Sequence, residues 1–276
     1  MNWPTRIAYE VLLHLPGRSR RLWVAQKLMS AKHWLKYSDP FFFTSVAVEI
    51  NTKCHRRCWY CPQSRQPAAD FHMSWEIFGT LLERLKEIRW TGAVTYCLFG
   101  EPLLDDRIVD FVRATRQALP GATILIQTNG DLLTLELVAV LIKAGLDHFC
   151  IMEHPPFTQR WKDNMRILAG KFPRQIRCER LDDSRLLNRA GILADRIPAD
   201  KPNWKCFAVL VNLPVRYNGD IGFCSEDYYR TLKIGNIQRD DLLTIWNRDP
   251  WPTLRRALRH GDRSALDLCH ECTGIC

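Results

Sequence analysis

The stretch Cys54-His55-Arg56-Arg57-Cys58-Trp59-Tyr60-Cys61 places three cysteines in a CxxxCxxC pattern. Three thiolates at this spacing suit an iron–sulfur cluster, because they leave one of its irons without a protein ligand. An open iron can bind a small molecule and support chemistry on it. The alternative is a zinc site, although structural zinc sites are closed by four ligands, commonly in paired CxxC motifs. The spacing therefore favours a catalytic cluster.

The residues around this loop predict that it lies at the carboxyl end of a β-strand. Residues 44–50 alternate and are rich in β-branched side chains, which is typical of a strand. Apolar residues then recur at helical spacing from Ile77 to Ile88, behind Ser74 as a helix N-cap. Strand, loop and helix in this order form the unit of α/β barrels, which place their chemistry at the carboxyl ends of the strands.

Two more short motifs each follow a strand-like run. Gly100-Glu101-Pro102 follows residues 94–99, and Thr128-Asn129-Gly130 closes the run 123–127. With the cysteine loop they occur in the order found in the radical SAM enzymes, and the chain resembles that family over most of its length. The resemblance implies a 4Fe4S cluster that binds S-adenosylmethionine (SAM) and cleaves it to a 5'-deoxyadenosyl radical.

The resemblance also implies roles for individual residues. The motif around Glu101 departs from the family's GGE pattern, since it reads Phe-Gly-Glu-Pro, but it keeps the carboxylate. The implied residues are Cys54, Cys58 and Cys61 as cluster ligands, Gly100, Glu101 and Pro102 at the SAM amino group, Thr128 and Asn129 at the ribose, and Tyr60 at the adenine.

A second set of cysteines lies near the carboxyl terminus. A cysteine, a spacer, GxxxxC and a distant CxxC resemble the Twitch domain, a shortened SPASM domain that binds an auxiliary 4Fe4S cluster. The expected ligands are Cys206, Cys224, Cys269 and Cys272, with Cys276 as a spare thiol that could replace Cys272. Four thiolates close a cluster, so its natural role is electron transfer. A zinc site remains the alternative for these four residues.

The chain further resembles the radical SAM dehydrogenases of aminoglycoside biosynthesis, which oxidise a secondary alcohol of an aminocyclitol to a ketone. This resemblance implies that Arg189 holds the substrate hydroxyl as an anchor, because arginine keeps its charge. It also implies that the auxiliary cluster accepts the electron left after hydrogen abstraction. A reductase or flavodoxin-type protein would supply electrons for SAM cleavage.

An epimerase is the alternative outcome of the same radical chemistry. A thiol on the far side of the substrate carbon could return a hydrogen atom and invert the centre. The cysteines outside both cluster motifs are Cys97, Cys150 and Cys178, all on expected strands, and Cys178 is the preferred donor because it precedes the loop with Arg189. The structural alternative is that such cysteines serve only as small buried hydrophobic residues.

Composition restricts the other classes of function. The chain has 276 residues, 46% of them hydrophobic, and a formal net charge of +9. The positive charge is compatible with an RNA-modifying radical SAM enzyme, but no RNA-binding module follows the barrel.

A cationic substrate would need carboxylates for its recognition. The candidates are Glu153, Asp182, Asp183, Glu226 and Asp227, with His154 as a proton acceptor. The sequence shows no signal peptide or membrane span, so we expect a cytoplasmic protein.

The expected fold is α/β, a partial parallel (β/α)6 radical SAM barrel with a C-terminal Twitch domain of β-hairpin plus helix. The expected domains are a basic helical extension (1–40), the barrel (41–200) and the Twitch domain (201–276). Strands are expected at 45–50, 93–99, 123–128, 148–152 and 175–180, with a helix at 132–144 capped by Thr134. Runs 209–215 and 221–224 should form the hairpin around a turn at 217–220.

Overall fold

The computed structural model describes residues 42–153, 158–180, 186–197 and 205–273. The chain divides into a unit that ends at Phe42 and a second unit, Phe43–Cys276, and the second is described below. Several predictions lie outside the described residues. They concern the extension 1–40 and the residues His154, Asp182, Asp183 and Cys276.

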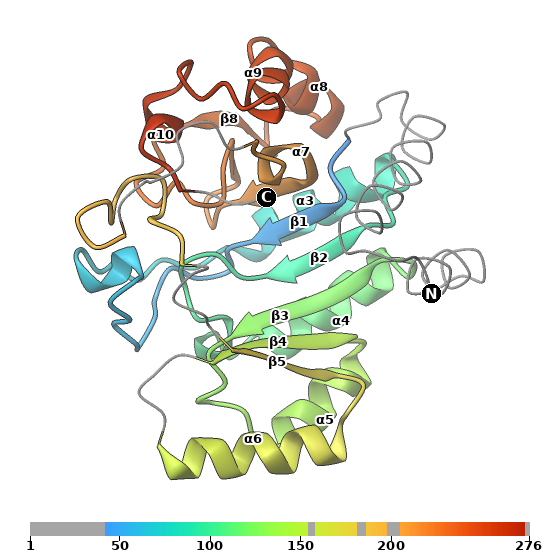
Figure 1. Cartoon of the computed structure of the whole chain (residues 1–276). Helices are drawn as coiled ribbons and strands as arrows, with labels where there is room; N and C mark the ends of the chain where they lie inside the picture. Colours follow the sequence, from blue (N-terminus) through green and yellow to red (C-terminus); the bar gives the residue numbers. More distant parts are fainter. Residues whose placement is uncertain (1–41, 154–157, 181–185, 198–204, 274–276) are drawn as a thin grey trace, which may run out of the picture. The chain divides into compact units, whose positions relative to one another are not determined.

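Within the described residues, the strands form one sheet in the order β5-β4-β3-β2-β1-β6-β7-β8. The first five strands pair in parallel, and their carboxyl ends meet at one edge, beside the segment that follows β1 (Figure 1). Their bounds confirm the five predicted strands to within a few residues: β1 Ser45–Val48, β2 Ala93–Tyr96, β3 Thr123–Thr128, β4 His148–Glu153 and β5 Ile176–Arg180.

Helices alternate with these strands. They are α3 Trp75–Glu87, α4 Ile108–Ala118, α5 Leu135–Ala144 and α6 Gln159–Lys171. Both predicted caps are present, because the hydroxyls of Ser74 and Thr134 accept hydrogen bonds from backbone N–H groups in the first turns of α3 and α5. Tyr96 of β2 lies against Phe78 and Phe111, so α3 and α4 cover the face of the sheet that carries Tyr96.

The carboxyl-terminal part continues the same sheet. Its elements are α7 Ala208–Val211, β6 Asn212–Val215, β7 Asp220–Gly222, β8 Lys233–Asn236, α8 Leu242–Asn247, α9 Trp251–Arg259 and α10 Asp267–His270. Strand β6 pairs in parallel with β1, while β7 and β8 add antiparallel strands. The hairpin therefore adjoins the first barrel strand.

One predicted strand in this part was too long. Residues 209–215 were expected to be extended throughout, but the first three belong to α7. Val209 and Leu210 are buried in this short helix, so apolar content alone did not distinguish it from a strand. The turn at 217–220 is confirmed, with Gly219 at φ +79° in the left-handed region that favours glycine.

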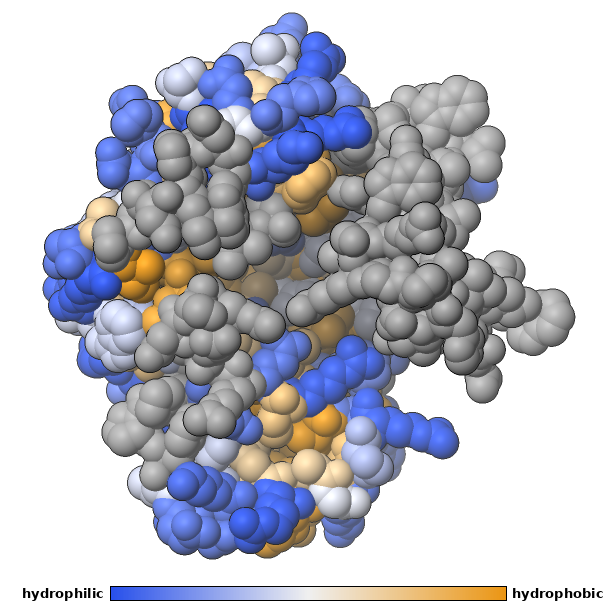
Figure 2. Space-filling model, in the orientation of Figure 1, coloured by the Kyte–Doolittle hydropathy of each residue, from blue (hydrophilic) through white to orange (hydrophobic). Residues whose placement is uncertain are grey.

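The fold class predicted from the sequence is confirmed, since a mostly parallel sheet alternates with helices and a hairpin with helices follows. No helix among the described residues is both long and apolar enough to cross a membrane. On the face shown in Figure 2, hydrophobic side chains reach the surface between hydrophilic regions above and below.

Candidate active site

The loop with Cys54, Cys58 and Cys61 is fixed by a buried glutamine. Gln63 follows the loop in a short 3-10 helix, Pro62–Ser64, and is 1% exposed. Its side-chain amide donates to the carbonyl groups of Thr52, at 2.8 Å, and Phe99, at 3.2 Å. The loop is thereby tied to the segments that follow both β1 and β2.

The three thiols of this loop interact electrostatically with one another. Burial raises the pKa of the Cys54 thiol to about 11 and raises the pKa values of Cys58 and Cys61. Among the described residues, no three histidine, cysteine or acidic side chains gather closely enough to hold a single metal ion. A cluster makes no such demand, because each thiolate binds a different iron, and the donor set fits one.

Glu101 is buried beside this loop, and its carboxylate accepts three hydrogen bonds. Oε1 accepts from the hydroxyl of Thr128 at 2.7 Å and from the N–H of Leu103 at 3.2 Å, and Oε2 accepts from the N–H of Asn129 at 3.0 Å. Burial raises the pKa of Glu101, and these bonds oppose that effect. The Glu101 carboxylate thus joins the Gly100-Glu101-Pro102 motif to the Thr128-Asn129-Gly130 motif, both of which are predicted to lie at SAM.

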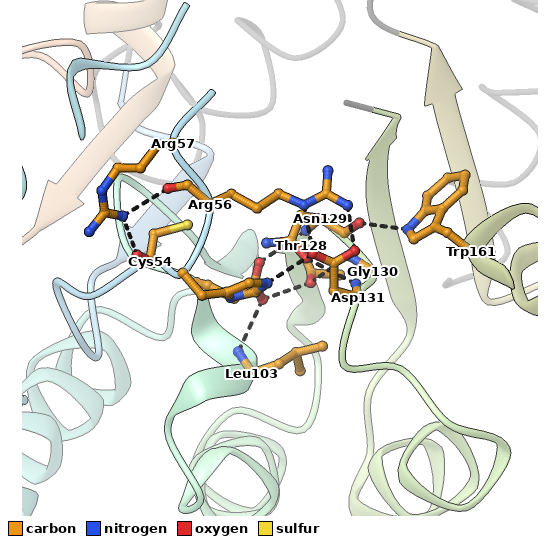
Figure 3. Close-up of polar contacts among 11 residues, drawn as sticks. Cys54, Arg56, Arg57, Leu103, Thr128, Asn129, Gly130, Asp131 and Trp161 are labelled. Carbon is orange, nitrogen blue, oxygen red and sulfur yellow. Dashed lines mark hydrogen bonds and ion pairs between the residues drawn. The ribbon is translucent and has the colours of Figure 1, made fainter. Parts of the chain in front are cut away.

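The neighbouring positions are closely packed. A Cβ atom at Gly100 would lie 2.2 Å from the carbonyl oxygen of Asn51, so only glycine fits there. Tyr60 is 3% exposed and meets Trp59 edge to face. Arg56 of the cysteine loop reaches across to pair with Asp131, which follows the Thr128-Asn129-Gly130 motif (Figure 3).

The second set of cysteines also gathers in the structure. Cys224 interacts electrostatically with Cys206 and Cys272, and so does Cys269. Burial raises the pKa of Cys269 to about 12 and that of Cys224 well above its usual value. The Cys224 sulfur accepts a hydrogen bond from the N–H of Glu226 at 3.3 Å. Four neighbouring thiols, of which Cys269 is buried, and an N–H that donates to the Cys224 sulfur fit an iron–sulfur cluster.

A loop containing Asn188 connects the two sets. Asn188 is fully buried, and its Oδ1 accepts from the N–H groups of Gly191, at 3.1 Å, and Thr273, at 3.0 Å. Its side-chain N–H donates to the carbonyl of Glu271. At the other end of the loop, Arg196 donates to the carbonyl of Trp59 at 2.6 Å. The loop therefore contacts both the CxxC segment and the CxxxCxxC loop.

Arg189 lies in this loop and forms an ion pair with Glu226. Its Nη1 donates to Glu226 Oε2 at 2.7 Å, and the two side chains are 28% and 20% exposed. Burial opposes the charge on Arg189, but Glu226 outweighs it and raises the pKa of the guanidinium, with smaller contributions from Cys61 and Cys272. Arg189 has φ +53°, a strained conformation for a non-glycine residue that is common at functional sites.

Strand register separates the three remaining cysteines. Cys178 is opposite Ile151, which packs near Met165 and Trp161 of α6, so Cys178 is on the helix-covered face. Cys150 is the neighbour of Ile151 on β4, so its side chain points to the opposite face of the sheet. Cys97 interacts electrostatically with Cys150. We call the face that carries Cys97 and Cys150 the inner face. The structure therefore places Cys178, the hydrogen donor preferred from the sequence, on the face opposite to that of Cys97 and Cys150, a separation that depends on strand register.

The candidate carboxylates also separate. Glu226 pairs with Arg189, as described, and is available at the site. Asp227 is 1% exposed and accepts hydrogen bonds from the N–H groups of Thr231 and Leu232, so it holds its own loop together. Glu153 is at the end of β4 and interacts electrostatically with Cys178.

The sequence did not indicate that Gln63 anchors the cysteine loop, since only the tertiary contacts of its side chain reveal that role.

Comparisons with known proteins agree with this arrangement. The model of the radical SAM superfamily matches residues 48–152, and a model described as an iron-sulfur cluster-binding domain, SPASM, matches residues 206–273. Together with a relative that is 32% identical over most of both chains, they show that this chain belongs to the radical SAM superfamily. The predicted cofactors, SAM and two iron–sulfur clusters, are confirmed at the level of these domains.

That relative is the S-adenosyl-L-methionine-dependent 2-deoxy-scyllo-inosamine dehydrogenase of Niallia circulans, and the match covers 84% of this chain and 94% of the relative. The crystal structure of BtrN in complex with AdoMet and 2-DOIA is 31% identical, with a TM-score of 0.77, over 85% of this chain and 94% of that one. An open form of BtrN covers the same shares at 27% identity and a TM-score of 0.67.

Proposed function

We propose that this enzyme oxidises a secondary alcohol of an aminocyclitol or aminoglycoside to a ketone during antibiotic biosynthesis. The observation that carries the proposal is the Arg189–Glu226 pair, because Arg189 interacts electrostatically with Cys61 of one set and Cys272 of the other. The similarity to a 2-deoxy-scyllo-inosamine dehydrogenase supports the substrate class. When bound, SAM and the clusters supply a hydrogen-abstracting radical and an acceptor for one electron.

The roles of the residues follow from this proposal. Cys54, Cys58 and Cys61 hold the SAM-binding cluster, and Gly100, Glu101, Pro102, Thr128, Asn129 and Tyr60 line the SAM site. Cys206, Cys224, Cys269 and Cys272 hold the auxiliary cluster. The Glu101 carboxylate supports the assignment of the SAM site, because its hydrogen bonds to Thr128 and Asn129 hold the two motifs together.

Arg189 and Glu226 divide the recognition of the substrate between them. The guanidinium donates to the alcohol oxygen and stabilises negative charge on it as the proton leaves. Glu226 is an acceptor for that proton or for the amine of the substrate, because its carboxylate is part of the same pair. A cationic substrate therefore meets a local carboxylate despite the net charge of +9.

Three further assignments belong to the proposal. The chain would be cytoplasmic, its partner a reductase or flavodoxin-type electron donor, and its domains bounded at residues 1–40, 41–200 and 201–276. The deciding experiment is anaerobic reconstitution with iron and sulfide, followed by turnover of candidate aminocyclitols with SAM and reductant. Ketone formation supports the dehydrogenase, and SAM cleavage without any ketone contradicts it.

Epimerisation is kept as a second candidate because two thiols lie on the inner face. Burial raises the pKa of Cys97 to about 12, which keeps this thiol protonated, the form that can donate a hydrogen atom. Replacing Cys97 or Cys150 by alanine would change the product of an epimerase but would leave a dehydrogenase forming ketone. Cys178→Ala is the matched control on the other face.

A further inference from the structure

A buried cluster of charges on the inner face has no role in the proposed chemistry. Glu49 directly follows β1, Arg216 directly follows β6, and Arg230 comes from the segment between β7 and β8. The Glu49 carboxylate pairs with Arg230 at 3.3 Å and with Arg216 at 3.8 Å. The side chains of Glu49 and Arg216 are only 1% and 3% exposed, so this pair is shielded from bulk water.

Arg216 is only partly satisfied in this cluster. Its Nη2 donates to the carbonyl of Asp227 at 2.7 Å, whereas Nε and Nη1 are buried without a hydrogen-bond acceptor. Burial lowers the pKa of this guanidinium even though Glu49 is close. Buried N–H groups without acceptors are unfavourable and rare, so this arrangement calls for an additional acceptor.

The spacing of the Glu49–Arg216 pair indicates what that acceptor is. The 3.8 Å between Nη1 and Oε1 is too long for a hydrogen bond and leaves the two groups only loosely engaged. Two carboxylates, Glu49 and Asp227, already balance the two guanidinium groups of Arg216 and Arg230. A neutral group that donates to a carboxylate and accepts from a guanidinium fits this environment. A hydroxyl does both.

The cluster adjoins the proposed reaction site. Asp227, whose carbonyl accepts from Arg216, is the neighbour of Glu226 in the chain, and Glu226 pairs with Arg189. Arg216 also lies 6.0 Å from the ring centre of Phe99 and interacts electrostatically with the Cys97 thiol on the inner face. A ring that presents one oxygen to Arg189 has further oxygens to present toward Arg216.

We propose that Glu49 and Arg216 form a second hydroxyl-binding subsite, in which a ring hydroxyl of the polyol substrate donates to Glu49 and accepts from Arg216. This inference deepens the proposed function and relies on it for the substrate class. The subsite would fix the rotation of the ring and so determine which carbon faces the radical. Arg230 is a positioning residue, because it holds the other oxygen of Glu49.

The test measures binding to the cluster-loaded, SAM-loaded enzyme without reductant. The probes are 2-deoxy-scyllo-inosamine and analogues that each lack one ring hydroxyl. We expect one analogue to bind about 10- to 100-fold more weakly than the parent, the range for a hydrogen bond to a charged group. Glu49→Gln and Arg216→Met should weaken parent binding similarly, yet bind that analogue about as well as the wild type does.

Several outcomes would overturn the subsite. One is that every analogue loses the same amount of affinity relative to the parent. Another is that the Glu49 and Arg216 variants still bind the parent more tightly than the analogue, as the wild type does. A third is that the enzyme binds none of these polyols. The analogues on the wild type alone decide the case if a variant does not fold. Arg248→Gln is the matched control, because Arg248 pairs with Asp240 at the surface and should not alter binding. Binding without ketone formation would contradict the proposed function while leaving the subsite standing.

Discussion

Arg189 and Glu226 come from different parts of the chain and join at 2.7 Å, where the guanidinium interacts with Cys61 of one cysteine set and Cys272 of the other. This pair is where a substrate could meet both redox centres. Loop residues 188–191 present Arg189 in a strained backbone conformation, which the hydrogen bonds of Asn188 maintain.

Arg189→Lys should retain charge but lose the geometry of the pair. Lysine cannot reproduce the planar donor group that meets Glu226, so we expect ketone formation to fall about 10- to 100-fold, the effect of losing one charged hydrogen bond. SAM cleavage should continue. Product analysis that counts 5'-deoxyadenosine and ketone separately checks this, with Arg248→Lys as a surface control. Equal loss of both products would contradict an anchoring role.

Asn188→Ala should loosen the connection between the Arg189 loop and the Cys269–Cys272 segment. The fully buried amide makes several hydrogen bonds to residues 191, 271 and 273. We expect a loss of about 2–4 kcal/mol in stability and weaker retention of the auxiliary cluster. Thermal unfolding and iron content per chain measure the two effects. Full iron content with unchanged ketone formation would contradict this connection.

The two cysteine sets should separate by function. Cys224→Ala should lower iron by about one cluster and abolish ketone formation while SAM is still cleaved, because the SAM-binding cluster remains. Cys58→Ala should abolish cleavage altogether. Iron counting, electron paramagnetic resonance and product analysis distinguish these outcomes. If Cys224→Ala retains full ketone yield, the second set is not the electron acceptor.

Acid should release Asp131 from Arg56. Burial opposes the Asp131 charge, but hydrogen bonds from Arg56 and His55 outweigh it and hold the carboxyl pKa below its usual value of 3.8. A lowered pKa in the folded state means that this pair stabilises the protein above about pH 4 and that its contribution is lost as pH falls further. The unfolding free energy of Asp131→Asn should therefore fall less than that of the wild type on acidification. If the unfolding free energies of the two proteins fall in parallel as pH is lowered, the Arg56–Asp131 pair contributes nothing to stability.

The sequence predicted the elements whose signals are local. The five strands and the caps Ser74 and Thr134 follow from periodicity and capping chemistry, and the cysteine motifs from their spacing. Long-range features were missed. The face on which Cys178 lies depends on register across β4 and β5, and the Glu49–Arg216 pair depends on β6 joining β1, a contact across more than half of the chain.

The fate of the substrate hydrogen tests the central claim most directly. A ring-deuterated aminocyclitol is turned over anaerobically in ordinary water with SAM, reductant and the reconstituted enzyme. We predict one deuterium in 5'-deoxyadenosine for each ketone formed, because the radical takes it from the carbinol carbon. An inverted alcohol that has replaced its deuterium with hydrogen, or a ketone formed with no label in 5'-deoxyadenosine, would contradict a radical alcohol dehydrogenase.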